Sequence, residues 1–133
     1  MKTSNYFTYS GAGRISVSRS VPRNTPAGYR LFKALAPGTW LYERKYKYDQ
    51  QAYCERYFRE VLSPLNAQEI YDTLCALTAP HEPVLLCWED LTQPDQWCHR
   101  RMIAQWFEQE LGIIVPEYVP PLTQKSNQLE LIL

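Results

Sequence analysis

Two short stretches of the sequence concentrate the residue types that carry out chemistry. The run ending in Cys87-Trp88-Glu89 supplies a thiol and a carboxylate, and Cys98-His99-Arg100 adds a second thiol, an imidazole and a guanidinium. A polar loop, residues 90–96, separates them. A helix that begins after this loop would add exposed N–H groups and partial positive charge at its first turn. The spacing predicts a site where a strand gives way to a helix.

An anionic ligand fits this chemistry best, because arginine makes forked, charge-assisted hydrogen bonds to phosphate and carboxylate. We predict that the ligand-binding residues are Arg19, Ser20, Arg23 and Arg100. A carboxylate beside arginines can act as a base or a nucleophile, or simply orient the arginines. We therefore predict Glu89 and His99 as the catalytic pair.

The cysteines allow three interpretations. Four cysteines in a chain without an apolar leader favour reduced thiols over a disulfide framework. Cys87 and Cys98 are predicted as structural or reactive thiols; Cys98 shares a helical register with Met102, which favours core packing over a thiolate nucleophile. No cofactor is predicted. Zinc is the remaining possibility, through Cys87, Cys98 and His99, but neighbours on a helix point about 100 degrees apart, and C-x₂-C spacing is absent.

Hydrophobic periodicity predicts the elements that position these residues. One helix is expected from an N-cap at Asp49 to residue 62, a second from an N-cap at Asn66 to residue 79, and a third from an N-cap at Asp95 to Gly112. Extended segments are expected at 6–9, 14–18, 83–88 and 113–115, with a helical turn within 29–35 and a loop or edge strand at 40–47.

The run 83–88 is apolar without interruption, as are parallel strands covered by helices on both faces. We expect a single three-layer α/β domain over residues 1–118, with a mostly parallel sheet flanked by helices, and a C-terminal extension over 119–133. If the strands near residues 17 and 88 are parallel neighbours, their carboxyl ends bring the predicted site residues to one edge of the sheet.

Length and charge limit the function classes. At 133 residues the chain fits one domain, and fourteen basic residues balance fourteen acidic ones, so broad coating of a nucleic acid is not expected. No apolar run approaches the roughly 18 residues that span a bilayer, and no apolar segment follows the N-terminus. We expect a cytoplasmic protein without membrane contact. A glycine-rich phosphate loop, a G-x-S-x-G elbow and an H-E-x-x-H motif are all absent.

The order of motifs resembles the DUF488 family from about residue 6 to residue 118. The most specific part is the apolar strand ending in Cys87-Trp88-Glu89 followed by Cys98-His99-Arg100; Leu35-Ala36-Pro37 and residues 15–19 support it. The resemblance implies a small cytoplasmic α/β protein of bacteria or of phage-infected cells, and no settled activity. The long loop 90–97 and the bulky Trp88 depart from the usual pattern.

Three functions remain open. The leading hypothesis is a pocket for a nucleotide-like or phosphate-like anion, with a reaction on that ligand as its second part. The second is a noncatalytic interaction factor, such as a phage-borne inhibitor of a host system, that binds a protein partner through residues 119–133. The third is a binding module stabilised by zinc.

Overall fold

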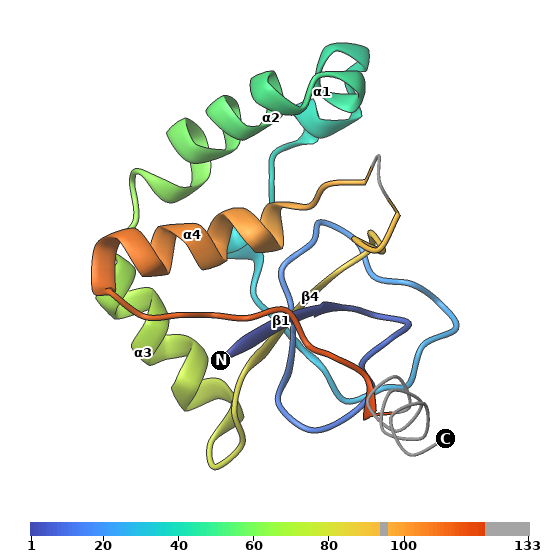
Figure 1. The fold of residues 1–133 in the computed structure, drawn as a ribbon, viewed down its shortest axis with the longest axis vertical. Helices are drawn as coiled ribbons and strands as arrows, with labels where there is room; N and C mark the ends of the chain where they lie inside the picture. Colours follow the sequence, from blue (N-terminus) through green and yellow to red (C-terminus); the bar gives the residue numbers. More distant parts are fainter. Residues whose placement is uncertain (94–95, 122–133) are drawn as a thin grey trace, which may run out of the picture.

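A computed structural model describes residues 1–93 and 96–121. Its sheet has four parallel strands in the order β1-β4-β2-β3, with bounds β1 (Lys2–Asn5), β2 (Arg14–Ser16), β3 (Arg30–Leu31) and β4 (Val84–Cys87) (Figure 1). β4 lies between β1 and β2, with Ile15 opposite Leu85. The predicted parallel sheet is therefore confirmed, and the strands that precede Arg19 and Glu89 are direct neighbours.

The longer helices follow the predicted pattern. They are α2 (Gln50–Tyr57), continued by a π-helical turn (Phe58–Leu62), α3 (Ala67–Thr78) and α4 (His99–Leu111). The side chains of Asp49 and Asn66 accept hydrogen bonds from the first turns of α2 and α3, and Gly112 ends α4 in the left-handed conformation at φ 68°. The predicted caps at Asp49 and Asn66 and the glycine stop are thus confirmed, whereas the predicted start of the third helix after Asp95 is wrong, because residues 96–98 are not helical and Cys98 is the N-cap.

Alternate residues of β4 enter two different clusters. Leu85 joins Ile15 and Val17 in the main core, against which α3 and α4 pack. Val84 and Leu86 face the other way, into a smaller cluster with Tyr6 from the loop after β1, to which Tyr9 and Tyr29 add their rings. The helices therefore cover one face of the sheet, and tyrosine-bearing loops cover the other.

Three further local predictions were wrong. Residues 2–5, which carry no hydrophobic side chain, form β1, and residues 6–8 turn instead of extending. Residues 40–47 are helical, in a 3-10 turn (Thr39–Tyr42) and α1 (Arg44–Tyr48). The helical turn predicted within 29–35 is present as a 3-10 turn (Lys33–Leu35), but it follows a short strand, β3, that was not predicted. Residues 113–115 form no strand; this segment reaches β1 only at the isolated bridge between Thr3 and Glu117.

Most of the predicted C-terminal extension lies outside the residues that the structure describes. Residues 119–121 are described, whereas the rest of the predicted partner-binding extension, 122–133, lies outside the described residues, as does the predicted N-cap Asp95. The division at residue 118 stays a prediction. Within the described ranges, no helix combines the length and apolarity needed to cross a bilayer.

Candidate functional site

Five of the predicted site residues line one cavity at the carboxyl ends of β2 and β4. The cavity has a volume of about 260 Å³. It is lined by Ser18, Arg19, Ser20, Pro37, Leu41, Tyr42, Tyr53, Cys87, Trp88, Glu89 and His99. The topology explains this convergence. β2 and β4 are parallel neighbours, so the residues that follow both strands lie at the same edge of the sheet.

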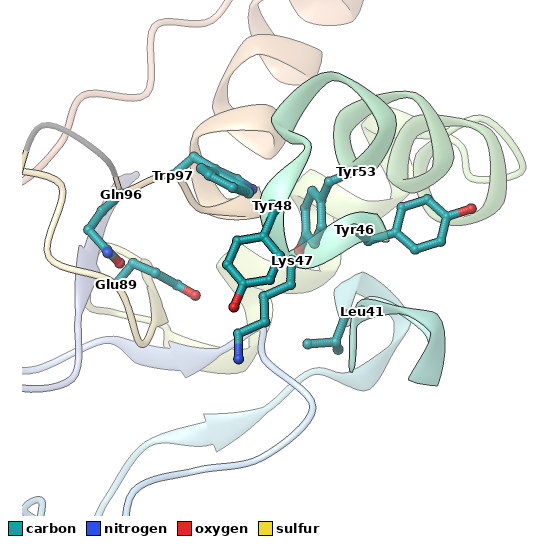
Figure 2. Close-up of a pocket in the computed structure, with 8 residues that line it drawn as sticks. All are labelled: Leu41, Tyr46, Lys47, Tyr48, Tyr53, Glu89, Gln96 and Trp97. Atoms are coloured by element: carbon teal, nitrogen blue, oxygen red, sulfur yellow. The ribbon is translucent and has the colours of Figure 1, made fainter. Parts of the chain in front are cut away.

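A larger cavity of about 500 Å³ adjoins the first and shares Leu41, Tyr53 and Glu89 with it. Its other lining residues are Tyr46, Lys47, Tyr48, Gln96 and Trp97. Figure 2 shows the Glu89 carboxylate and the Lys47 amine directed into the same space, with aromatic rings around it. Among the described residues, the lining of the two cavities offers one carboxylate, cations and several ring faces.

Glu89 stands where the two cavities meet. It follows the end of β4 by two residues, and its side chain is half-buried. Burial raises the pKa of this carboxyl above its usual value, while the Arg100 charge opposes the shift in part. In the described part of the chain, no other residue donates a hydrogen bond to its carboxylate. The carboxylate therefore faces the cavity without a protein partner.

His99 is the first residue of α4 and is buried. Its Nε2 lies 2.6 Å from the carbonyl oxygen of Val17, and because a carbonyl only accepts, Nε2 carries the hydrogen. Nδ1 therefore accepts, at 3.3 Å, from the hydroxyl of Tyr53. Burial lowers the pKa of His99 to about 4, and the Arg100 charge acts in the same direction. The imidazole is thus held neutral, with a fixed tautomer.

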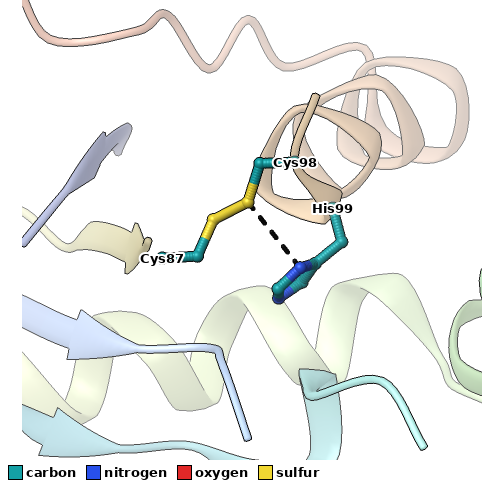
Figure 3. Close-up of side chains that lie close together, drawn as sticks. All are labelled: Cys87, Cys98 and His99. Carbon is teal, nitrogen blue, oxygen red and sulfur yellow. Dashed lines mark hydrogen bonds between the residues drawn. A yellow bond between two sulfur atoms is a disulfide. The ribbon is translucent and has the colours of Figure 1, made fainter. Parts of the chain in front are cut away.

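Cys87 and Cys98 form a disulfide next to this imidazole (Figure 3). The expectation of four free thiols is wrong for this pair, while Cys54 and Cys75 are free. Cys98 is buried as predicted, but not through a helical register: its backbone is extended, at φ −146° and ψ 144°, and it precedes α4 as the N-cap. The argument that Cys98 and His99 diverge on a helix therefore does not apply.

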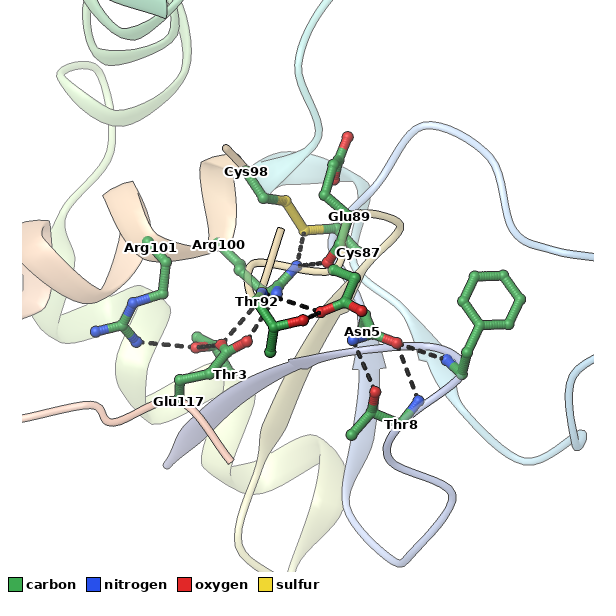
Figure 4. A network of polar contacts seen from close by, with 12 residues as sticks. Thr3, Asn5, Thr8, Cys87, Glu89, Thr92, Cys98, Arg100, Arg101 and Glu117 are labelled. Carbon is green, nitrogen blue, oxygen red and sulfur yellow. Dashed lines mark hydrogen bonds and ion pairs between the residues drawn. A yellow bond between two sulfur atoms is a disulfide. The ribbon is translucent and has the colours of Figure 1, made fainter. Parts of the chain in front are cut away.

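Arg100 lies wholly inside the protein and not in the cavity. Its guanidinium donates to both carboxylate oxygens of Glu117, at 3.0 and 2.7 Å, and to the carbonyl oxygen of Glu89 at 2.8 Å (Figure 4). A further N–H points at Cys87 Sγ, 3.3 Å away. These partners give Arg100 a role different from the predicted anion contact: it fixes the chain on which Glu89 stands.

The other arginines near the site have different surroundings. Arg19 lines the smaller cavity and makes one long hydrogen bond, 3.4 Å, to the Pro37 carbonyl. Arg23 is exposed and is not among the residues that line either cavity. Arg101 donates to Thr3 Oγ1 and to the Val115 carbonyl, both at 2.9 Å.

Three residues of the site were missed by sequence reasoning. They are Tyr53, which lies in a segment predicted only as a helix, Lys47, which lies in a segment predicted as a loop or edge strand, and Glu117, which had no predicted role. Only Lys47 carried a signal, because it stands in an aromatic stretch rich in Lys and Arg. The partnership of Glu117 with Arg100 joins residues 17 apart, and no local pattern marks it.

Fold and site together define a small α/β protein with a parallel sheet and, at the carboxyl ends of its strands, a cavity lined by apolar, aromatic and charged residues. The family model DUF488-N3a, described as the active DUF488-N3 subclade, matches residues 3–111. The chain belongs to the DUF488 family. No curated protein and no solved structure matches it significantly.

Proposed function

We propose that the two adjoining cavities bind a small nucleotide-like anion and that Glu89 takes part in a reaction on it. The observation that carries the proposal is the placement of Glu89, a half-buried carboxyl that faces both cavities without a partner side chain among the described residues. Leaving such a group unpaired costs stability, and groups of this kind are a feature of functional sites.

The surroundings of Glu89 fit the parts of a nucleotide. Arg19 and Ser20 at one end, and Lys47 at the other, supply donors for phosphate oxygens. The rings of Tyr48 and Trp97 line the larger cavity, where a base can stack on an aromatic face. A carboxylate between these two regions lies close to the sugar of a bound nucleotide.

Two groups are assigned to the reaction. Glu89 acts as the acid, base or nucleophile toward the bound ligand. His99 lines the same cavity and is the second candidate, and the hydrogen bond that its Nδ1 accepts from the hydroxyl of Tyr53 helps to orient the imidazole. The family whose model matches is described as active, which favours an enzyme over a noncatalytic interaction factor.

Thermal unfolding in the presence of a panel of nucleoside monophosphates and diphosphates tests the binding half. We expect one class of these ligands to raise the unfolding temperature of the wild-type protein and of Glu89→Gln, which keeps the shape of the side chain. Chromatography of the same mixtures tests the reaction: wild type converts the stabilising ligand, and Glu89→Gln converts it at least about a hundredfold more slowly, the usual scale for a lost acid–base group.

Failure has a distinct signature at each stage. Absence of stabilisation by every member of the panel would exclude a nucleotide-like ligand. Equal conversion by wild type and a folded Glu89→Gln variant would remove Glu89 from the reaction while leaving binding intact.

A further inference from the structure

We propose that Cys87, Cys98 and His99, in the reduced protein, form a binding site for a zinc ion beside the smaller cavity. Their three ligand atoms are buried and lie within 4.8 Å of one another. Ligands of a tetrahedral zinc ion are about 3.5 Å apart, given bonds of about 2.3 Å to sulfur and 2.0 Å to nitrogen. The cluster is thus close to the size that zinc requires.

The backbone separation of the two cysteines supports an ion between the sulfurs. Their Cα atoms are 7.2 Å apart, in a cysteine pair separated by 11 residues. Disulfides usually hold Cα atoms about 4.4 to 6.8 Å apart, whereas an ion adds two metal–sulfur bonds in place of one sulfur–sulfur bond. The main chain is therefore spaced more widely than a disulfide needs.

His99 is prepared as a ligand. Metal-binding histidines usually donate their second ring N–H to a carbonyl or carboxylate, which fixes the tautomer. Here Nε2–H donates to the Val17 carbonyl at 2.6 Å, so the lone pair of Nδ1 is directed toward Cys98 Sγ, 3.7 Å away. The bond that Nδ1 accepts from Tyr53 is long, at 3.3 Å, and the ion would replace it.

Arg100 supplies an outer hydrogen bond to Cys87, as Val17 does to His99. Its Nη1 lies 3.3 Å from Cys87 Sγ, and an N–H donor at this distance stabilises a thiolate. The two thiolates balance the charge of the ion, and Glu117 balances that of Arg100. The fold therefore provides outer hydrogen bonds to two of the three ligands, and the arginine that does so is fixed by Glu117.

Zinc binding requires the disulfide to be opened, and the electron balance is simple. Two molecules of a low-molecular-weight thiol reduce the Cys87–Cys98 bond: each cysteine gains a hydrogen, and the reductant is oxidised to its own disulfide. Zinc then binds the two sulfurs as thiolates, and two protons are released.

Three protein ligands leave one position of a tetrahedral zinc ion open, and catalytic zinc sites fill it with water or substrate. Cys87 and His99 both line the smaller cavity, so the open position is reached from there, next to Glu89. The site does not depend on the nucleotide proposal, because the ion is held by the three side chains alone.

Metal analysis of the full chain, purified with a thiol reductant and a small excess of zinc, tests the proposal. We expect about one zinc ion per chain after gel filtration, the stoichiometry of a single site. Cys87→Ser, Cys98→Ser and His99→Ala should each lose the ion, while the matched controls Cys54→Ser and Cys75→Ser should retain it, since both cysteines lie outside the cluster.

A second measurement remains informative if a buried variant does not fold. In the reduced wild-type protein, zinc should protect two of the four thiols from a thiol-reactive dye, and a chelator should restore their reaction. Cobalt in place of zinc should give sulfur-to-cobalt charge-transfer absorption, which the Cys54→Ser control keeps. Reduced wild-type protein without stoichiometric zinc, and with all four thiols equally reactive with and without the metal, would overturn the proposal.

Discussion

Glu117 holds Arg100 through two parallel hydrogen bonds, Nε to Oε1 at 3.0 Å and Nη2 to Oε2 at 2.7 Å. The same carboxylate accepts from Thr3 Oγ1 at 2.6 Å, so the segment after α4 is tied to β1 and to the first turn of α4. Because Arg100 also binds the carbonyl of Glu89, the pair determines where the cavity's carboxylate stands. A residue outside both cavities thus positions the site.

Removal of the Glu117 carboxylate should destabilise the protein strongly. Glu117→Ala leaves the fully buried guanidinium of Arg100 without its counter-charge, and we expect the free energy of unfolding to fall by about 3 kcal/mol. Urea denaturation at neutral pH measures the change. The matched control is Glu60→Ala, which breaks the more exposed pair with Arg56 and should cost far less, because solvent screens that pair. Similar costs for both variants would contradict the structural role of Glu117.

Gly13 should tolerate no side chain, because its backbone lies directly against the residues at the start of β4. It has φ 81°, its carbonyl accepts from Val84 N at 2.8 Å, and a Cβ there would overlap the Glu82 carbonyl oxygen. We expect Gly13→Ala to cost about 3 kcal/mol, from strain and overpacking together. Gly112→Ala, with φ 68° and open space around it, should cost only about 1 kcal/mol. Equal melting temperatures for the two variants would show that the close approach is unimportant.

Trp88 should set the position of the Arg19 loop. Its indole N–H donates to the Ser20 carbonyl at 2.9 Å, so Trp88→Phe keeps a ring but removes the bond. We expect weaker binding of the stabilising nucleotide, by roughly fivefold, the value of one hydrogen bond of about 1 kcal/mol. Titration calorimetry measures the loss. Phe7→Leu, which alters the ring beside Trp88 but leaves the bond to Ser20, should bind as wild type does; equal loss in both variants would assign the effect to packing.

The helices and the central strand could be predicted because their side chains are buried in regular patterns. β4 is apolar at all four positions and buried on both faces, and Asp49 and Asn66 occupy helix caps that their side chains satisfy directly. β1 was not predicted because its buried residues, Thr3, Ser4 and Asn5, are polar. They are held in the sheet by pairing with β4, which is distant in the sequence. Hydrophobic patterns do not detect a buried polar strand.

The site could be predicted in location more than in detail. Adjacency of two parallel strands was enough to bring Arg19, Glu89 and His99 to one cavity. The burial of Arg100 could not be foreseen, since its partner Glu117 follows a turn and a proline-containing segment. Nor could the contact of Cys98 with Cys87, because it depends on an extended residue just before α4.

The dissociation constant of the nucleotide identified by thermal unfolding, compared among wild type, Arg19→Ala and Arg23→Ala, tests the central claim most directly. Arg19 lines the cavity and Arg23, four residues later, does not. Loss of a charged hydrogen bond to phosphate predicts at least about tenfold weaker binding for Arg19→Ala. Arg23→Ala should bind as wild type does. Unchanged affinity in a folded Arg19→Ala variant, or an equal loss in Arg23→Ala, would contradict an anion site in this cavity.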